Sequence, residues 1–251
     1  MRLQCVVLLI WLFFQSSVVH ADSFRIAAAS SLQFVLQDII EEYRAKTNRS
    51  APKIVYGSSG NLYRQIEQGA PYDLFFSARD ELVKKLYKSG KSDNSGDQFG
   101  IGRLVLLTGL ALKAGDSLPD IISQKILPEK QKLAIANPAH APYGRAAKQV
   151  LQSLSLWDAT KSNVVNGEQV SQAAQFVVNG AVPYGLVSLS LALSPRVAQD
   201  TQYLLIDESL HEPIVLQMVQ LATAPEPVEH FYQFVLKNDS VNSIFTRYGL
   251  R

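Results

Sequence analysis

Two pairs of serines each lie between a predicted strand and the predicted helix that follows it. Ser30 and Ser31 follow the apolar segment 24–29, and Ser58 and Ser59 follow segment 52–57. The first turn of a helix has backbone N–H groups without intrahelical partners and the positive end of the helix dipole, so it holds anions without a formal charge. Small hydroxyl side chains add donors and let an anion approach closely. Two such turns predict an anion-binding site.

A simpler interpretation of each pair is an N-cap, which stabilises a helix by about 1 kcal/mol. One pair alone would favour capping. The second pair, together with Pro142-Tyr143-Gly144 at the start of another predicted helix, favours anion binding.

Other chemistries fit these motifs less well. The segment 57–60 (GSSG) lacks the lysine that completes a phosphate-binding P-loop, and Asn61 stands where a hydrolase elbow has its second glycine. His140, His211 and His230 do not have the spacing of zinc ligands, so we interpret them as surface or packing residues.

An alternative function is an exported hydrolase or transferase with Ser31 or Ser59 as its nucleophile. Such an enzyme needs a histidine or lysine base beside the serine, and none of the motifs places one there.

The N-terminus has the pattern of a signal peptide. Arg2 precedes an apolar core over residues 6–14, and Val19-His20-Ala21 forms a small-x-small cleavage pattern. The core is shorter than the roughly 20 residues of a membrane-spanning helix. We therefore predict cleavage after Ala21, which leaves a soluble exported chain without its single cysteine, Cys5.

The composition of the remaining chain is that of an ordinary globular protein. Removing residues 1–21 takes away one arginine and no acid, which leaves 23 basic and 22 acidic side chains. A net charge near +1 gives no reason to expect nucleic acid or an anionic membrane surface as a partner. The length suits one large domain or two lobes.

The predicted elements alternate between strands and helices, as in an α/β protein. Predicted strands occupy residues 24–29, 52–56, 72–77, 103–108, 133–136, 185–189, 203–206 and 214–221. Predicted helices occupy residues 31–46, 62–68, 81–88, 142–154, 168–178, 228–237 and 240–247. Residues 91–100 are polar and contain glycine, so we predict a surface loop there.

Five segments, in order along the chain, resemble the periplasmic molybdate-binding proteins. They are residues 27–32 (AAASSL), 57–60 (GSSG), 65–78 (QIEQGAPYDLFFSA), 137–144 (NPAHAPYG) and 247–249 (RYG). The resemblance implies a type II periplasmic binding protein, with mixed sheets flanked by helices in two lobes and two crossing hinge strands. It implies lobe I over residues 22–104 and 207–251, and lobe II over residues 105–206.

The same resemblance implies which residues bind the oxyanion. The first serine ligand of the family falls on Ser31 or Ser30, depending on the anchor of the alignment. The second falls on Ser59, and backbone N–H ligands fall on Tyr143 and Val170.

One position departs from the family pattern, because Ser188 stands where well-known members have a tyrosine hydroxyl. We hypothesise that the phenol of Tyr143 replaces the missing hydroxyl and that Ser188 lies too far away to bind.

The donor types agree with this ligand. A molybdate-like dianion offers only acceptors, so N–H and O–H donors suit it, while a carboxylate repels it and protonated phosphate lacks a partner for its proton. None of the candidate segments places an acid at a donor position, and Glu168 is expected to point away from the ligand.

The resemblance further implies a periplasmic protein that delivers molybdate or tungstate to a membrane-bound ABC permease. The molybdenum would be held through its oxygens only, without direct protein ligation and without a cofactor. We also expect a monomer and no enzymatic activity, with a sulfate or other oxyanion binder as the nearest alternative.

Overall fold

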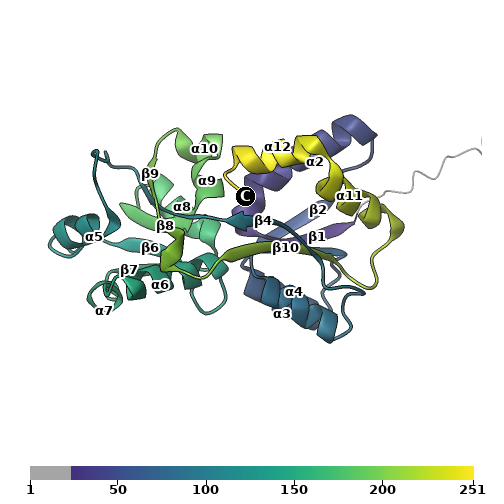
Figure 1. Ribbon diagram of the computed structural model, residues 1–251, viewed down its shortest axis with the longest axis horizontal. Coiled ribbons are helices and arrows are strands. Elements are labelled where there is room, and N and C mark those ends of the chain that lie inside the picture. The colour runs from purple at the N-terminus through teal and green to yellow at the C-terminus, as the bar shows by residue number, and fades with distance from the viewer. Residues whose placement is uncertain (1–23) are drawn as a thin grey trace, which may run out of the picture.

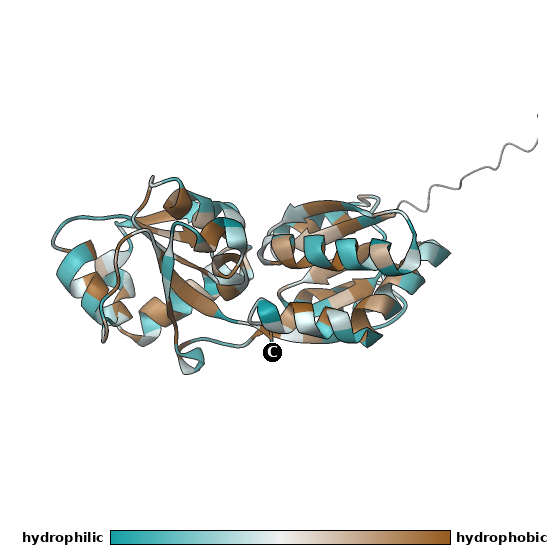
Figure 2. Ribbon diagram, turned by 90° about the horizontal axis from the view of Figure 1, so that it is seen from above, coloured by the Kyte–Doolittle hydropathy of each residue, from teal (hydrophilic) through white to brown (hydrophobic). Residues whose placement is uncertain are grey.

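The computed structural model describes residues 24–251, so the predicted signal peptide, residues 1–21, lies outside the described residues. The chain forms two five-stranded mixed sheets, each flanked by helices (Figure 1). We call each sheet with its helices a lobe. Figure 2 shows the two lobes as separate bodies side by side.

The sheet of the first lobe has the strand order β2-β1-β3-β10-β4. Its strands are β1 (Arg25–Ala29), β2 (Lys53–Gly57), β3 (Leu74–Ser77), β4 (Asp97–Gly102) and β10 (Ile214–Gln220). Strand β1 is parallel to β2 and β3, whereas β10 is antiparallel to β3 and β4.

Helices cover both faces of this sheet. One face carries α2 (Gln33–Thr47), α11 (Glu226–Lys237) and α12 (Asp239–Arg247), and the other carries α3 (Ser59–Glu67) and α4 (Asp80–Lys88) (Figure 1). The alternation of side chains along a strand explains this arrangement. In β3, Phe76 packs in the core with α2, while its neighbour Phe75 packs in the core with α3 and α4.

The sheet of the second lobe has the strand order β7-β6-β8-β5-β9. Its strands are β5 (Leu104–Thr108), β6 (Leu133–Ala136), β7 (Val164–Gly167), β8 (Tyr184–Ser188) and β9 (Gln202–Leu205). The longer helices of this lobe are α6 (Pro142–Ser153) and α8 (Val170–Val178). Shorter helical segments are α5 (Leu118–Ile121), the π-helical turn η2 (Ile122–Ile126), α7 (Trp157–Thr160), α9 (Leu189–Ala192) and α10 (Pro195–Ala198).

The chain passes between the lobes at two places. It leaves the first sheet after β4 and enters the second at β5, and it returns from β9 to β10 through residues 206–213, which include the 3-10 helix η3 (Glu208–Leu210). No helix within residues 24–251 is both long and apolar enough to cross a membrane.

The structure differs from the predicted elements at two places, one predicted loop and one strand that was not predicted. Residues 97–102, expected within or beside a loop, form β4, because pairing with the apolar strand β10 overrides the low strand propensity of a glycine-containing segment. Residues 164–167 form β7, which was not predicted. Its parallel pairing with β6 joins Leu133 to Val164 and Ala136 to Gly167, a long-range contact that no local pattern reveals.

Candidate functional site

Four helix starts from the two lobes face one another. In the first lobe, β1 leads into the 3-10 turn η1 (Ser30–Leu32) ahead of α2, and β2 leads into α3. In the second lobe, α6 follows β6 and α8 follows β7. Because β1 is parallel to β2 and β6 is parallel to β7, each pair of helices begins at one edge of its sheet. Hydrogen bonds between Ser30 and Ser171 and between Gly60 and His140 bring the two edges together.

Ser30 is buried and connects the lobes. Its hydroxyl oxygen accepts a hydrogen bond of 3.3 Å from the backbone N–H of Ser171, the residue after Val170 in the first turn of α8. Since the oxygen accepts in this bond, the Ser30 proton remains available to donate.

Ser31 and Tyr143 contribute two buried hydroxyls from opposite lobes. Within residues 24–251, neither Ser31 Oγ nor Tyr143 Oη has a hydrogen-bond partner. Burial raises the pKa of Tyr143, and the nearby Ser31 hydroxyl opposes that rise. A buried hydroxyl without a partner costs about 1–3 kcal/mol, so two of them near each other indicate a place built for an added acceptor.

Gly102, at the end of β4, makes room for the Tyr143 phenol. A Cβ at Gly102 would lie 2.1 Å from Tyr143 Oη, far closer than atoms can approach. The phenol therefore lies directly against the segment that crosses between the lobes.

The remaining candidate donors are the Ser59 hydroxyl and the backbone N–H groups at the starts of α3, α6 and α8. Ser59 is fully buried, and its oxygen accepts a bond of 3.0 Å from the N–H of Ala78. Ser59 and Val170 are the first residues of α3 and α8, and Tyr143 is the second residue of α6. Their backbone N–H groups therefore belong to first turns, where the helix itself supplies no acceptor.

Ser188 has a different environment. It is the N-cap of α9, and its oxygen accepts a bond of 3.4 Å from the N–H of Leu191. Its hydroxyl also lies 3.2 Å from that of Ser190, which donates to the carbonyl of Ser31 at 2.7 Å. Ser188 thus reaches the first lobe through Ser190, whereas Tyr143 lies beside Ser31 itself.

His140 is a bridging residue that the sequence patterns did not identify. We expected a surface or packing histidine, but its side chain is only 9% exposed and contacts the first lobe. Its Nδ1 lies 2.8 Å from Ser58 Oγ, and its Nε2 lies 3.3 Å from Glu168 Oε1. Ser58 and His140 are 82 positions apart, so only the tertiary structure reveals the pair.

The two candidate nucleophiles lack a catalytic base. In the described part of the chain, neither Ser31 Oγ nor Ser59 Oγ has a histidine or lysine within hydrogen-bond distance. Ser58 does have a histidine, but it is buried and its oxygen caps α3 by accepting from the N–H of Asn61. The arrangement therefore does not favour nucleophilic catalysis by these serines.

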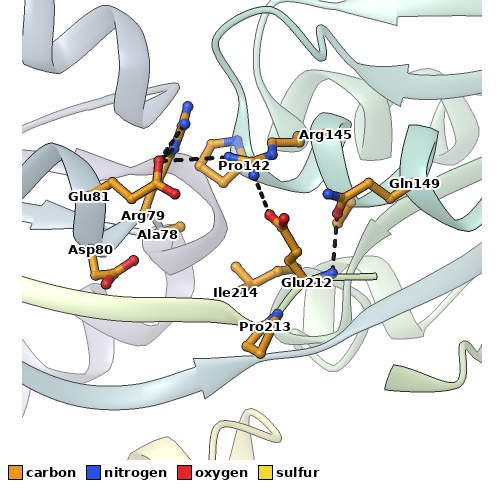
Figure 3. A pocket seen from close by; sticks show the side chains of 11 residues that line it. Ala78, Arg79, Asp80, Glu81, Pro142, Arg145, Gln149, Glu212, Pro213 and Ile214 are labelled. Atoms are coloured by element: carbon orange, nitrogen blue, oxygen red, sulfur yellow. Dashed lines mark hydrogen bonds and ion pairs between the residues drawn. The ribbon is translucent and has the colours of Figure 1, made fainter. Parts of the chain in front are cut away.

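A charged cavity of about 50 Å³ lies between the lobes, and its lining includes Ala78, which donates to Ser59, and Pro142, which precedes Tyr143 (Figure 3). Arg145 of α6 contacts Glu81 of α4 at 3.8 Å and also binds Glu212, which precedes β10. Because the arginine is already paired with two carboxylates, this cavity does not offer a free cationic site to an anion. Across residues 24–251, no group of three or more His, Cys, Asp or Glu is placed to hold a metal ion.

Two α/β lobes with neutral helix-start donors between them define a two-lobed, type II solute-binding protein. The chain belongs to the bacterial extracellular solute-binding protein family, whose profile matches residues 24–251. This is a family of solute-binding proteins rather than of enzymes. The family and fold expected from the sequence are confirmed.

Individual relatives agree with this assignment. The chain is 34% identical to the protein YvgL of Bacillus subtilis over 229 residues, covering 89% of this chain and 84% of that protein. It is 31% identical to the molybdate-binding protein ModA of Azotobacter vinelandii over 236 residues, covering 92% and 90%. The solved structure of the Azotobacter vinelandii periplasmic molybdate-binding protein superposes with a TM-score of 0.82 at 28% identity, covering 91% of this chain and 99% of that one.

Proposed function

We propose that this protein is the solute-binding component of a molybdate ABC importer and that it also takes tungstate. The observation that carries the proposal is the pair of buried hydroxyls, Ser31 Oγ and Tyr143 Oη, which come from opposite lobes and lack partners in the described chain. They lie among helix starts, where an anion is favoured. The similarity to molybdate-binding relatives supports molybdate as the anion.

The proposed ligand shell consists of neutral donors. Ser30, Ser31 and Ser59 supply hydroxyls from the first lobe, and Tyr143 supplies a phenol and a backbone N–H from the second. Val170 adds a backbone N–H at the start of α8. Ser188 is not part of the proposed shell, because its hydroxyl lies 3.2 Å from that of Ser190, which donates to the Ser31 carbonyl and can accept the Ser188 proton.

The shell suits a dianion that cannot donate. Each hydrogen bond from a neutral group to an ionised one contributes roughly 1.5–3 kcal/mol, so six or seven bonds support sub-micromolar binding after ordering costs. Protonated phosphate would leave its own proton without an acceptor. Molybdate and tungstate would then be separated from sulfate by the size of the space between the lobes.

The proposed mechanism is closure around the anion. The first lobe binds through its serines, and the second lobe then adds Tyr143 and Val170, which shifts the population toward the closed state. An ABC permease in the membrane would recognise that closed shape. In this proposal the protein is a periplasmic monomer exported by a cleaved signal peptide, without catalytic activity or cofactor, and the molybdenum is held only through its oxygens.

Isothermal titration calorimetry of the exported protein with molybdate, tungstate, sulfate and phosphate tests the proposal. We expect tight one-to-one binding of the first two and no heat from the others. Tight sulfate binding would assign the protein to sulfate transport instead. Absence of heat with all four would mean that the serines serve only as helix caps. Turnover of a generic ester that Ser59→Ala or Ser31→Ala abolishes would revive the hydrolase alternative.

A further inference from the structure

A second set of contacts joins the lobes through residues outside the proposed ligand shell. Ser58, Gly60 and Asn61 at the start of α3 meet His140 and Glu168, which precede α6 and α8 in the other lobe. We call these five residues the rim contact.

The backbone part of the rim contact brings the lobes very close. The N–H of Gly60 donates to the carbonyl of His140 across 3.0 Å. A Cβ at Gly60 would lie 2.6 Å from that carbonyl oxygen and 3.0 Å from the Cα and Cβ of His140. All three atoms belong to the opposite lobe, so a methyl group at this position would obstruct the approach of the lobes.

The side chains of the rim contact form a connected network of two hydrogen bonds and one ion-pair contact. His140 Nε2 lies 3.3 Å from Glu168 Oε1, a contact within the second lobe. His140 Nδ1 and Ser58 Oγ share a hydrogen bond of 2.8 Å across the lobes. Glu168 also accepts from Asn61 Nδ2 at 2.5 Å. Two of these interactions, Ser58 with His140 and Asn61 with Glu168, cross from one lobe to the other and must break when the lobes separate.

Glu168 is the exposed member of this network, with 63% of its side chain accessible, whereas His140 is largely buried. The network therefore runs from solvent at Glu168 inward to Ser58, the residue next to Ser59 of the proposed shell. A ligand held between the lobes cannot leave on this side without these bonds opening.

We propose that the rim contact is a latch, in which Gly60 permits full closure and His140 with Glu168 holds it, so that these residues set the rate of ligand release. The inference rests on the proposed function for the identity of the ligand. It adds a role in retention for residues that do not touch the anion.

The decisive variant is Gly60→Ala. Gly60 lies in α3 with φ outside the left-handed region, so alanine fits the helix of the open lobe and raises its intrinsic helix propensity. Gly109→Ala is the matched control, because the nearest atom to a Cβ there is Asp200 O at an ordinary 3.8 Å. Stopped-flow fluorescence with molybdate gives the association and dissociation rates of each variant.

We expect Gly60→Ala to release molybdate at least about tenfold faster, with an association rate within about twofold of the parent, because affinity differences within one interface reside mainly in dissociation. Its melting temperature without ligand should be unchanged or higher. His140→Ala keeps the hydrogen bond from the Gly60 N–H to the carbonyl of residue 140 but loses the contact with Ser58. This variant should release molybdate about threefold faster or more. Parental release rates in Gly60→Ala would overturn the latch.

A second measurement separates the latch from the identity of the ligand. Spin labels at the exposed positions Lys88 and Lys161, one on each lobe, report the distribution of interlobe distances in protein with and without molybdate. If the parent binds no molybdate, the proposed function fails, and the latch is judged on the ligand-free distribution alone. A shift of Gly60→Ala to longer distances would support the latch, and identical distributions would overturn it.

Discussion

The hydroxyl of Ser30 and the backbone N–H of Ser171 form a hydrogen bond between the two lobes, across 3.3 Å and within the buried interior. The adjacent hydroxyl of Ser31 has no partner in the described chain. The hydroxyls of two neighbouring serines thus have different environments: that of Ser30 connects the lobes, while that of Ser31 is unpaired among the described residues.

Replacing Ser30 by alanine removes the bond to Ser171 and one proposed ligand donor. We expect molybdate affinity to fall by roughly 10- to 150-fold, the equivalent of one hydrogen bond to an ionised group. Calorimetry measures the change. Ser123→Ala, which removes an exposed hydroxyl bonded only to the carbonyl of Asp120, is the control. Equal affinity in Ser30→Ala and the parent would remove Ser30 from the site.

Replacing Tyr143 by phenylalanine removes a hydroxyl that is buried without a partner in the described chain. We expect about tenfold weaker molybdate binding, because a donor to the dianion is lost. Thermal stability without ligand should stay the same or rise, since an unpaired polar group leaves the interior. Calorimetry and thermal unfolding of the same sample give both values.

Ser188→Ala is the companion variant and should behave in the opposite way. Ser188 caps α9, so we expect a loss of about 1 kcal/mol in the free energy of unfolding with little change in affinity. If Ser188→Ala weakened binding while Tyr143→Phe did not, the hypothesis that Tyr143 supplies the missing hydroxyl would be wrong.

Gly102→Ala tests whether the crossing segment positions the Tyr143 phenol. A Cβ at Gly102 would lie 2.1 Å from Tyr143 Oη, so we expect the phenol to be displaced and affinity to fall by at least about tenfold. In a Tyr143→Phe background the colliding oxygen is absent, so Gly102→Ala should reduce molybdate affinity less than it does in the parent. Strictly additive losses in this double-mutant cycle would show that the two residues act independently.

The phenol of Tyr143 also predicts a pH dependence of stability. Burial raises its pKa above the ordinary value of 10. Below pH 10 the folded and unfolded chains both keep the proton, so the contribution to stability is fully present. Above pH 10 the unfolded chain releases the proton while the folded chain retains it, so stability falls by up to about 1.4 kcal/mol per pH unit.

Urea unfolding of the parent and of Tyr143→Phe between pH 8 and pH 11 measures this effect. We expect the stability of the phenylalanine variant to decline less steeply above pH 10. Tyr87→Phe removes a phenol from a side chain that is 49% exposed and serves as the control. If the free energy of unfolding declined equally with pH in the parent and in Tyr143→Phe, a raised pKa of the buried Tyr143 phenol would be contradicted.

Features that depend only on neighbouring residues could be predicted from the sequence. The serine pairs after β1 and β2 and the proline before Tyr143 mark helix starts, because capping and the pairing of first-turn N–H groups are local properties. The ordered motifs also determined the family and the two-lobed fold. Which residues contact the anion stays a prediction.

Which of these helix starts lie close together follows from the tertiary structure. Strand β4 exists because β10 pairs with it, although its own composition favours a loop. The sequence could not distinguish Ser30 from Ser31, since the difference lies in a bond to a residue 141 positions away. The role of His140 likewise depends on Ser58, which approaches its Nδ1 from the first lobe, and on Glu168, which follows β7 in its own lobe. Contacts of this kind follow from how the two lobes pack, and no local pattern of residues encodes that packing.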